Sequence, residues 1–235
     1  MACHAVIPAA GVGKRFGAGM PKQYLMLAGR SIQQHTLDRL GAMSEISQIV
    51  VAISAEDTLA QTLPYARPER LRFVPGGAER MDSVLAGLRA LRASGAADSD
   101  WVLVHDVARP LLRPADVRHL LTALADDPIG GILANPVRDT MKRGSADGIE
   151  ATVARDNLWH ALTPQMFRLG ALAQALEAAL ADAAIVTDEA SAMERLGHRP
   201  RLVEGARDNI KITFPDDLAL AEALLAEQIR TGVWK

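Results

Sequence analysis

Residues 4–24 read HAVIPAAGVGKRFGAGMPKQY, a short apolar run followed at once by a loop rich in glycines and cations. The run 4–8 is typical of a buried strand. In the loop, glycines let backbone N–H groups approach an anion without a Cβ in the way, and cations add full positive charges. These residues are Gly11, Gly13, Gly17, Gly19, Lys14, Arg15 and Lys22. We therefore predict that the loop wraps an anion, such as a triphosphate, at the carboxyl end of the first strand.

The spacing of this loop differs from the spacings of two common phosphate-binding loops. No G-K-[ST] follows the glycines, so the loop is not a Walker A loop. A G-x-G is present, but the helix of a dinucleotide-binding fingerprint does not start there and Pro21 intervenes. A Rossmann dehydrogenase is therefore disfavoured. The alternative is a glycine-rich turn that only changes the chain direction, which is less favoured because three cations share the loop.

The overall composition is that of a soluble globular protein, with 49% apolar and 23% charged residues. The length of 235 residues suits one sizeable core, so we expect a single domain over residues 1–235. The formal net charge of −2 argues against a nucleic-acid partner. Cys3, the one cysteine, excludes an internal disulfide and fits a reducing compartment. Because the sequence has no signal-peptide pattern and no apolar run near the ~18 residues of a membrane span, we expect a cytoplasmic protein without a membrane partner.

Short apolar runs alternate with amphipathic stretches along the chain. The runs are continuously apolar, as in strands covered on both faces, and they span residues 4–8, 48–54, 71–76, 101–106 and 130–136. The amphipathic stretches predict helices at 31–43, 79–92, 114–125, 168–182, 186–197 and 215–229, with a last strand near 200–205. Ser31 can cap the first helix, and Pro114 suits the first turn of the third. This alternation predicts an α/β fold with a mostly parallel sheet flanked by helices, and a ligand beyond the carboxyl ends of the strands.

Residues 137–158, VRDTMKRGSADGIEATVARDNL, interrupt this alternation. Two short β-prone runs flank GSADG, in which Asp147-Gly148 is a strong signal for a tight turn. We predict a β-hairpin arm that projects from the body. An arm that buries little on its own chain packs on another chain, so we expect a homodimer. The alternative is a solvated loop.

Two carboxylates lie next to predicted strands. Asp106 follows one strand, and Asp208 precedes another. Asp106 comes after an apolar run and lies at the sheet edge where ligands bind. Since Mg²⁺ takes one or two carboxylates together with phosphate oxygens, Asp106 is a candidate metal ligand, and Arg109 can pair with a carboxylate or a phosphate. The alternative is a simple strand-end turn. Asp208 precedes a short alternating run, 209–213, expected as an edge strand; it would complete the metal site, and Lys211 would receive an anion.

The histidines do not form a metal-ligand spacing. His105 lies beside Asp106, but the alternation of a strand turns it to the opposite face. We expect a hydrogen-bonded structural residue rather than a catalytic base.

Several segments together resemble the 2-C-methyl-D-erythritol 4-phosphate cytidylyltransferase family of the non-mevalonate isoprenoid pathway. In chain order they are PAAGVGKRF, PKQY, GGAERMDSV, VLVHDVARP, NPVRDTMK, LWHALTPQMF, VTDEASAME and VEGARDNIKIT. The resemblance covers about residues 4–225 in the same order and spacing. It implies a Rossmann-like nucleotidyltransferase fold with a β-arm that clasps a second subunit.

The resemblance also implies roles for individual residues. Arg15 and Lys22 would stabilise the transition state, while Asp106 and Asp208 would hold Mg²⁺ on the triphosphate of CTP. The residues that would bind and aim a sugar-alcohol phosphate are Arg155, Lys211, Thr140, Arg109, Thr163 and Thr187. The residues near the nucleotide would be Ala9, Ala10, Gly11, Gly13, Gly77, Ser83 and Asp106. Because Arg155 and Thr140 fall on the arm, they would serve the active site of the partner subunit.

The implied reaction transfers a cytidylyl group from CTP to 2-C-methyl-D-erythritol 4-phosphate and releases pyrophosphate. Two alternatives stay open: a cytidylyltransferase of the same fold that acts on ribitol 5-phosphate, and a nucleotide-binding regulatory domain without turnover. The second is less favoured because all the charged residues that the reaction needs are present. They are Arg15, Lys22, Asp106, Asp208, Arg155 and Lys211.

Overall fold

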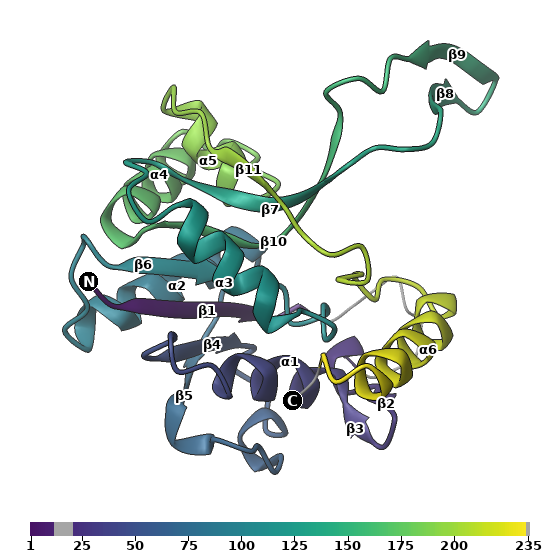
Figure 1. The fold of residues 1–235 in the computed structure, drawn as a ribbon. Coiled ribbons are helices and arrows are strands. Elements are labelled where there is room, and N and C mark those ends of the chain that lie inside the picture. The colour runs from purple at the N-terminus through teal and green to yellow at the C-terminus, as the bar shows by residue number, and fades with distance from the viewer. Residues whose placement is uncertain (12–20, 234–235) are drawn as a thin grey trace.

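The computed structural model describes residues 1–11 and 21–233. Within this part of the chain, seven strands form the central sheet in the order β11-β7-β10-β6-β1-β4-β5 (Figure 1). Their bounds are β1 Cys3–Ala9, β4 Ile49–Ile53, β5 Leu71–Pro75, β6 Trp101–Val104, β7 Gly130–Pro136, β10 Trp159–Arg168 and β11 Arg201–Glu204. Strand β10 pairs antiparallel with both of its neighbours, and the other neighbouring pairs are parallel. The prediction of a mostly parallel sheet is confirmed.

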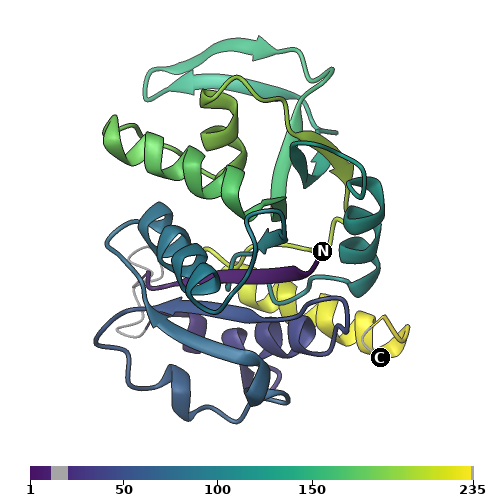
Figure 2. The same cartoon turned by 90° about the vertical axis from the view of Figure 1, so that its left-hand side faces the viewer.

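Helices cover both faces of the sheet, as Figures 1 and 2 show. One core cluster joins the sheet to helices α1 and α3, and the opposite cluster joins it to α2, α4 and α5. The bounds are α1 Ile32–Gly41, α2 Arg80–Ala93, α3 Pro114–Ala123, α4 Leu169–Ala181 and α5 Glu189–Arg195. Because the sheet is covered twice, successive residues of one strand enter different clusters. Ile49, Val51 and Ile53 of β4 face the first cluster, whereas Val50 faces the second.

A third, smaller cluster lies beside the main body. Helix α6, Asp216–Arg230, packs there against the short strand β2, Met26–Leu27, which pairs with β3, Arg30–Ser31. The remaining 3₁₀ turns are η1 Lys22–Tyr24, η2 Ala60–Thr62 and η3 Pro68–Arg70. None of the helices in the described residues is long and apolar enough to cross a bilayer.

Local sequence signals explain where most of these helices begin. Ser31 caps α1 through a capping box, since its hydroxyl accepts from Gln34 N while the Gln34 side chain accepts from Ser31 N. Pro114 occupies the first position of α3, where its missing N–H costs no hydrogen bond. The predicted helices therefore agree with the observed ones, and their ends differ by only a few residues.

Two features of the sheet differ from the sequence prediction. Strand β10 was not expected, because Pro164 lies in its middle and proline is rare in central strands. The pairing of β10 with β7 shifts register between Ala161 and Gln165, so the proline falls in an irregularity of the ladder. In addition, residues 209–213 form no strand; Ile212 N donates to Ala108 O, which ties this extended segment to the turn after β6.

The predicted hairpin arm is present. Strands β8, Met141–Ser145, and β9, Gly148–Val153, pair with each other alone and stand away from the body in Figure 1. Gly148 has a φ of +129°, a conformation that favours glycine at this turn. Ile149 is 71% exposed on the arm. Dimerisation through the arm stays a prediction.

Candidate active site

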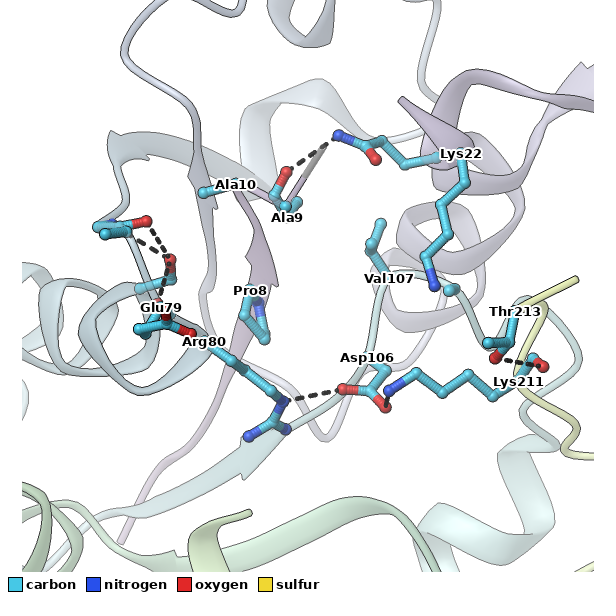
Figure 3. A pocket seen from close by; sticks show the side chains of 16 residues that line it. Pro8, Ala9, Ala10, Lys22, Glu79, Arg80, Asp106, Val107, Lys211 and Thr213 are labelled. Carbon is cyan, nitrogen blue, oxygen red and sulfur yellow. Dashed lines mark hydrogen bonds and ion pairs between the residues drawn. The ribbon is translucent and has the colours of Figure 1, made fainter. Parts of the chain in front are cut away.

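A cavity of about 470 Å³ opens at the carboxyl ends of β1 and β6. This volume suits a small-molecule ligand. The edge of the sheet was predicted to hold the ligand, since parallel strands expose their carboxyl ends together there. Figure 3 shows the side chains around it. The lining comes from residues 8–11, Lys22, Gln23, residues 77–80, Ser83, residues 106–108, Lys211 and Thr213.

One wall of the cavity is a tight loop before α2. Gly77 N donates to the Ser83 hydroxyl at 3.2 Å, and Gly76 N donates to Ile53 O at 2.7 Å. A Cβ at Gly77 would lie 2.3 Å from the Asp82 Cβ, so only glycine fits this close approach. The predicted nucleotide-binding residues in the described part of the chain all line the cavity: Ala9, Ala10, Gly11, Gly77, Ser83 and Asp106.

Lys22 reaches the cavity from the opposite wall. Its 3₁₀ turn is anchored because Gln23 Nε2 donates to Ala9 O at 3.0 Å and the Tyr24 hydroxyl donates to Asp57. Lys22 Nζ donates to Ile212 O at 3.1 Å, which directs the ammonium toward the Lys211 segment. The other predicted residues of the loop, Gly13 and Arg15, lie outside the described residues.

Asp106 lies between cations. Its Oδ1 is 3.2 Å from Arg80 Nε, and its Oδ2 is 2.9 Å from Lys211 Nζ and 3.5 Å from Arg109 Nε. Figure 3 shows Arg80 and Lys211 reaching the carboxylate from opposite sides. Burial alone would raise the pKa of Asp106, but Arg80, Lys211 and Arg109 together lower it well below its usual range. The carboxylate is therefore ionised at every physiological pH.

Thr163 and His105 fix the backbone beneath Asp106. The Thr163 hydroxyl accepts from Asp106 N at 3.1 Å and lies 2.9 Å from His105 Nδ1, while His105 Nε2 lies 3.1 Å from Arg109 O. Since a carbonyl only accepts, Nε2 carries the proton, and Nδ1 accepts from the hydroxyl. Burial lowers the pKa of His105 to about 4, so the ring is neutral. The expectation of a structural histidine agrees with these contacts.

Several predicted site residues do not line the cavity. Arg109 and Thr163 are buried behind Asp106, and Arg109 Nη1 donates to Asn209 O at 2.8 Å. Thr187 is exposed at the start of the segment leading into α5. Thr140 and Arg155 are exposed on the arm, where Arg155 donates to Arg138 O.

Asp208 pairs with Arg113, a different arginine from those that contact Asp106. Both Asp208 oxygens accept from Arg113, at 2.7–3.0 Å, and Oδ2 also accepts from Gln228 Nε2 at 2.7 Å. This carboxylate ties α6 to the turn before α3, and it does not line the cavity. In this structure an arginine fork engages Asp208. Its role as a second metal ligand stays a prediction.

The remaining donor set can hold Mg²⁺ through Asp106. In the described residues, no three His, Cys, Asp or Glu side chains are grouped to share a metal ion. However, Mg²⁺ needs only one or two carboxylates when phosphate oxygens complete its shell. Asp106 is ionised and lines the cavity, so its chemistry fits this role.

Two residues near the cavity were not predicted. Arg80 lines the cavity and contacts both Asp106 and Glu189, and Glu189 is 1% exposed. Both residues fall inside segments that resemble the family, GGAERMDSV and VTDEASAME. For Arg80, the available signal was its place at the start of a helix that follows a double glycine. No local signal connects it to a glutamate more than one hundred positions later.

The sheet topology, the glycine-lined cavity and its basic rim define a Rossmann-like nucleotidyltransferase. A family model described as IspD, 2-C-methyl-D-erythritol 4-phosphate cytidylyltransferase, matches residues 3–227. The chain belongs to this family.

Individual relatives agree with this membership. The 2-C-methyl-D-erythritol 4-phosphate cytidylyltransferase of Ectopseudomonas mendocina is 54% identical over 226 residues, which cover 96% of each chain. The crystal structure of the Francisella tularensis enzyme has a TM-score of 0.83 and 35% identity, covering 95% of this chain and 100% of that one. The Thermus thermophilus structure has a TM-score of 0.80 and 31% identity, covering 96% of this chain and 100% of that one.

We predict that His105 makes folding sensitive to acid. Its pKa is about 4 in the folded chain and near 6.5 when unfolded, so the unfolded chain binds more protons between these values. The free energy of unfolding should fall by about 3 kcal/mol as pH falls from 6.5 to 4, and level off below. Urea titrations of wild type and His105→Gln across this range measure it.

The variant cannot take up the proton, so its stability should vary less with pH than that of wild type. His119→Gln, at an exposed position of α3, is the control and should keep the wild-type slope. Equal slopes for His105→Gln and wild type would contradict the prediction.

Proposed function

We propose that this chain transfers a cytidylyl group from CTP to 2-C-methyl-D-erythritol 4-phosphate, releasing pyrophosphate, as a step in making isoprenoid precursors. The observation that carries the proposal is a cavity lined by Lys22, Asp106 and Lys211 in a chain that matches this family over residues 3–227. The setting we propose is the cytoplasm, which fits the buried Cys3, whose pKa burial raises to about 12, so that it stays a thiol.

The chemical problem of this reaction is electrostatic. A phosphate oxygen of the acceptor attacks the α-phosphorus of CTP, and it needs no general base because it is already ionised near neutral pH. Two like unit charges ~4 Å apart at an effective dielectric of ~20 repel by ~4 kcal/mol, and several such pairs meet here. Cations around the reacting phosphorus therefore lower the barrier.

The cavity supplies these cations. We propose that Lys22, together with Arg15 of the same glycine-rich sequence, stabilises the charge that develops on the triphosphate. Lys211 receives the acceptor phosphate and aims its oxygen, since its side chain is 41% exposed and lines the cavity. When bound, Mg²⁺ on Asp106 would neutralise triphosphate oxygens. Asp106, which now pairs with Lys211 and Arg80, would be the residue that holds the metal, and Lys211 would bind the acceptor phosphate.

The acceptor is tested by a direct comparison. We expect pyrophosphate release with CTP, Mg²⁺ and 2-C-methyl-D-erythritol 4-phosphate, and at least tenfold lower kcat/KM with ribitol 5-phosphate, a gap of about 1.4 kcal/mol in transition-state binding. A preference for ribitol 5-phosphate would show that this compound is the acceptor and would contradict the proposal. No turnover with either acceptor, together with measurable CTP binding, would favour the regulatory alternative.

We predict that Lys22→Ala lowers kcat by about 10²-fold, the usual scale for losing one preorganised electrostatic donor. The folded state should be retained, because η1 stays anchored by Gln23 and Tyr24. Steady-state kinetics with thermal unfolding check both expectations. Arg195→Ala, which removes an exposed ion pair with Asp182 far along α5, is the control and should keep wild-type kcat. A Lys22→Ala kcat near wild type would remove Lys22 from the mechanism.

We propose further that two copies of the chain form a dimer through the arm and share active sites. The arm buries little on its own chain, and it presents Ile149 to solvent. Arg155 and Thr140 are exposed at its base, away from the cavity of their own subunit. A second copy that receives the arm would cover the apolar residue and gain Arg155 near its acceptor phosphate.

Arg155→Ala should raise KM for the acceptor and leave KM for CTP unchanged. Mixed with Lys22→Ala, it should also restore activity, because the two changes lie in different subunits. In a mixed dimer, one site carries both changes and the other carries neither, so about a quarter of all sites in an equal mixture should be wild type. Mixing, unfolding and refolding the two variants, then assaying at low acceptor concentration, measures this. No gain over the separate variants would show that Arg155 serves its own subunit, and a monomer in sedimentation would exclude the shared site.

A further inference from the structure

Arg80 and Glu189 form a buried ion pair beside the cavity that the reaction described above does not use. Arg80 Nη1 and Nη2 lie 2.5 Å and 3.0 Å from the two oxygens of Glu189. The Glu189 side chain is 1% exposed, and that of Arg80 is 28% exposed. A carboxylate is rarely buried this deeply, and it requires a paired cation. The pair therefore fixes Arg80 in one orientation.

Both residues are held in place by their own helices. Arg80 is the first residue of α2, after Glu79, whose capping box closes the start of the helix. Glu189 is the first residue of α5, and Asp188 before it caps that helix through Ser191 N at 2.9 Å.

The β10 residue Gln165 clamps the start of α5 to the sheet. Its Nε2 donates to Asp188 Oδ2 at 2.8 Å, and its Oε1 accepts from Ala190 N at 2.8 Å. Glu189 lies between these two anchored residues, so its carboxylate has little freedom to move.

This arrangement decides which edge of Arg80 meets Asp106. With both terminal nitrogens on Glu189, only Nε faces Asp106, at 3.2 Å. Arginine otherwise binds a carboxylate with two parallel N–H groups, which is the stronger geometry. Glu189 therefore prevents Arg80 from closing on Asp106 as a fork. Asp106 keeps its other oxygen toward Lys211 and the cavity.

We propose that Glu189 is a positioning residue that acts through Arg80: it holds the guanidinium edge-on, so that the Asp106 carboxylate stays open to the nucleotide and its metal. The proposal rests on the proposed cytidylyl transfer. Without Glu189, Asp106 is the nearest carboxylate left to Arg80, and a fork on it would compete with the nucleotide. The motif VTDEASAME then has two roles: it forms the start of a helix, and the negative charge of its Glu189 orients Arg80 at the active site.

The test is Glu189→Gln, which keeps the shape of the side chain and removes its charge. We expect kcat to fall by about tenfold, the lower end of the range for residues that orient a ligating side chain. KM for the acceptor should stay within about twofold, since Lys211 is untouched. Glu177→Gln is the matched control, because Glu177 of α4 also pairs with an arginine of α2, Arg89, but on the exposed surface; it should keep wild-type kcat.

A second variant separates positioning from a purely structural role. Arg80→Lys keeps the charge but has no fork to join two carboxylates, so it should lose kcat to a similar extent. If Glu189 acts through Arg80, adding Glu189→Gln to Arg80→Lys should lower kcat no further. A structural role alone would instead lower the thermal midpoint and leave kcat of the folded enzyme unchanged.

One readout does not depend on turnover. In ¹⁵N spectra, Arg80 Nε–H should give a protected signal in wild type and Glu177→Gln, missing in Arg80→Lys and shifted in Glu189→Gln. A Glu189→Gln kcat within twofold of wild type, additive losses in the double variant, or an unshifted Arg80 signal would each overturn the proposal. A wild type without turnover but with the expected Arg80 shifts would instead count against the proposed function.

Discussion

The contact on which the site depends is a single carboxylate held among cations. Asp106 accepts from Arg80 and Lys211 and faces Arg109, and these residues come from three separate parts of the chain. The sheet brings them together because the carboxyl end of β6 meets the start of α2 and the extended segment near residue 211 at one edge. The ion pairs join these segments at one edge, and we propose that the same cations bind two phosphorylated substrates.

This arrangement places positively charged side chains at the site and pairs them with carboxylates. Buried carboxylates are costly unless a cation accompanies them, so Lys211 pairs with Asp106 and Arg80 pairs with Glu189. In the reaction that we propose, the phosphates of the substrates would replace the carboxylate as partners of these cations. The neighbouring lining residues with small side chains, such as Gly77 and Ala10, leave room in the cavity, and we propose that the nucleotide lies there.

Sequence patterns predicted the parts of the molecule that have local causes. The strands and helices follow from apolar runs and capping residues, and Asp106 follows from a carboxylate placed directly after a strand. The strand β10 was missed because Pro164 contradicts a central strand unless the ladder is irregular there. The pairing of Asp208 with Arg113 and of Arg80 with Glu189 was not predictable, because ion pairs between distant segments leave no periodic or compositional signal. The arginine partner of Asp208 could not be seen in the sequence, and the predicted metal role of Asp208 stays a prediction.

We propose that Lys22 and the cations around Asp106 exchange their present partners for the phosphates of two substrates. A crystal structure of the chain with CTP and magnesium tests it most directly. The account predicts the triphosphate over the loop of residues 8–24, with the metal on Asp106 and with Lys22 on phosphate oxygens. A nucleotide bound elsewhere, with Asp106 still paired to Lys211 and Lys22 directed to solvent, would contradict it.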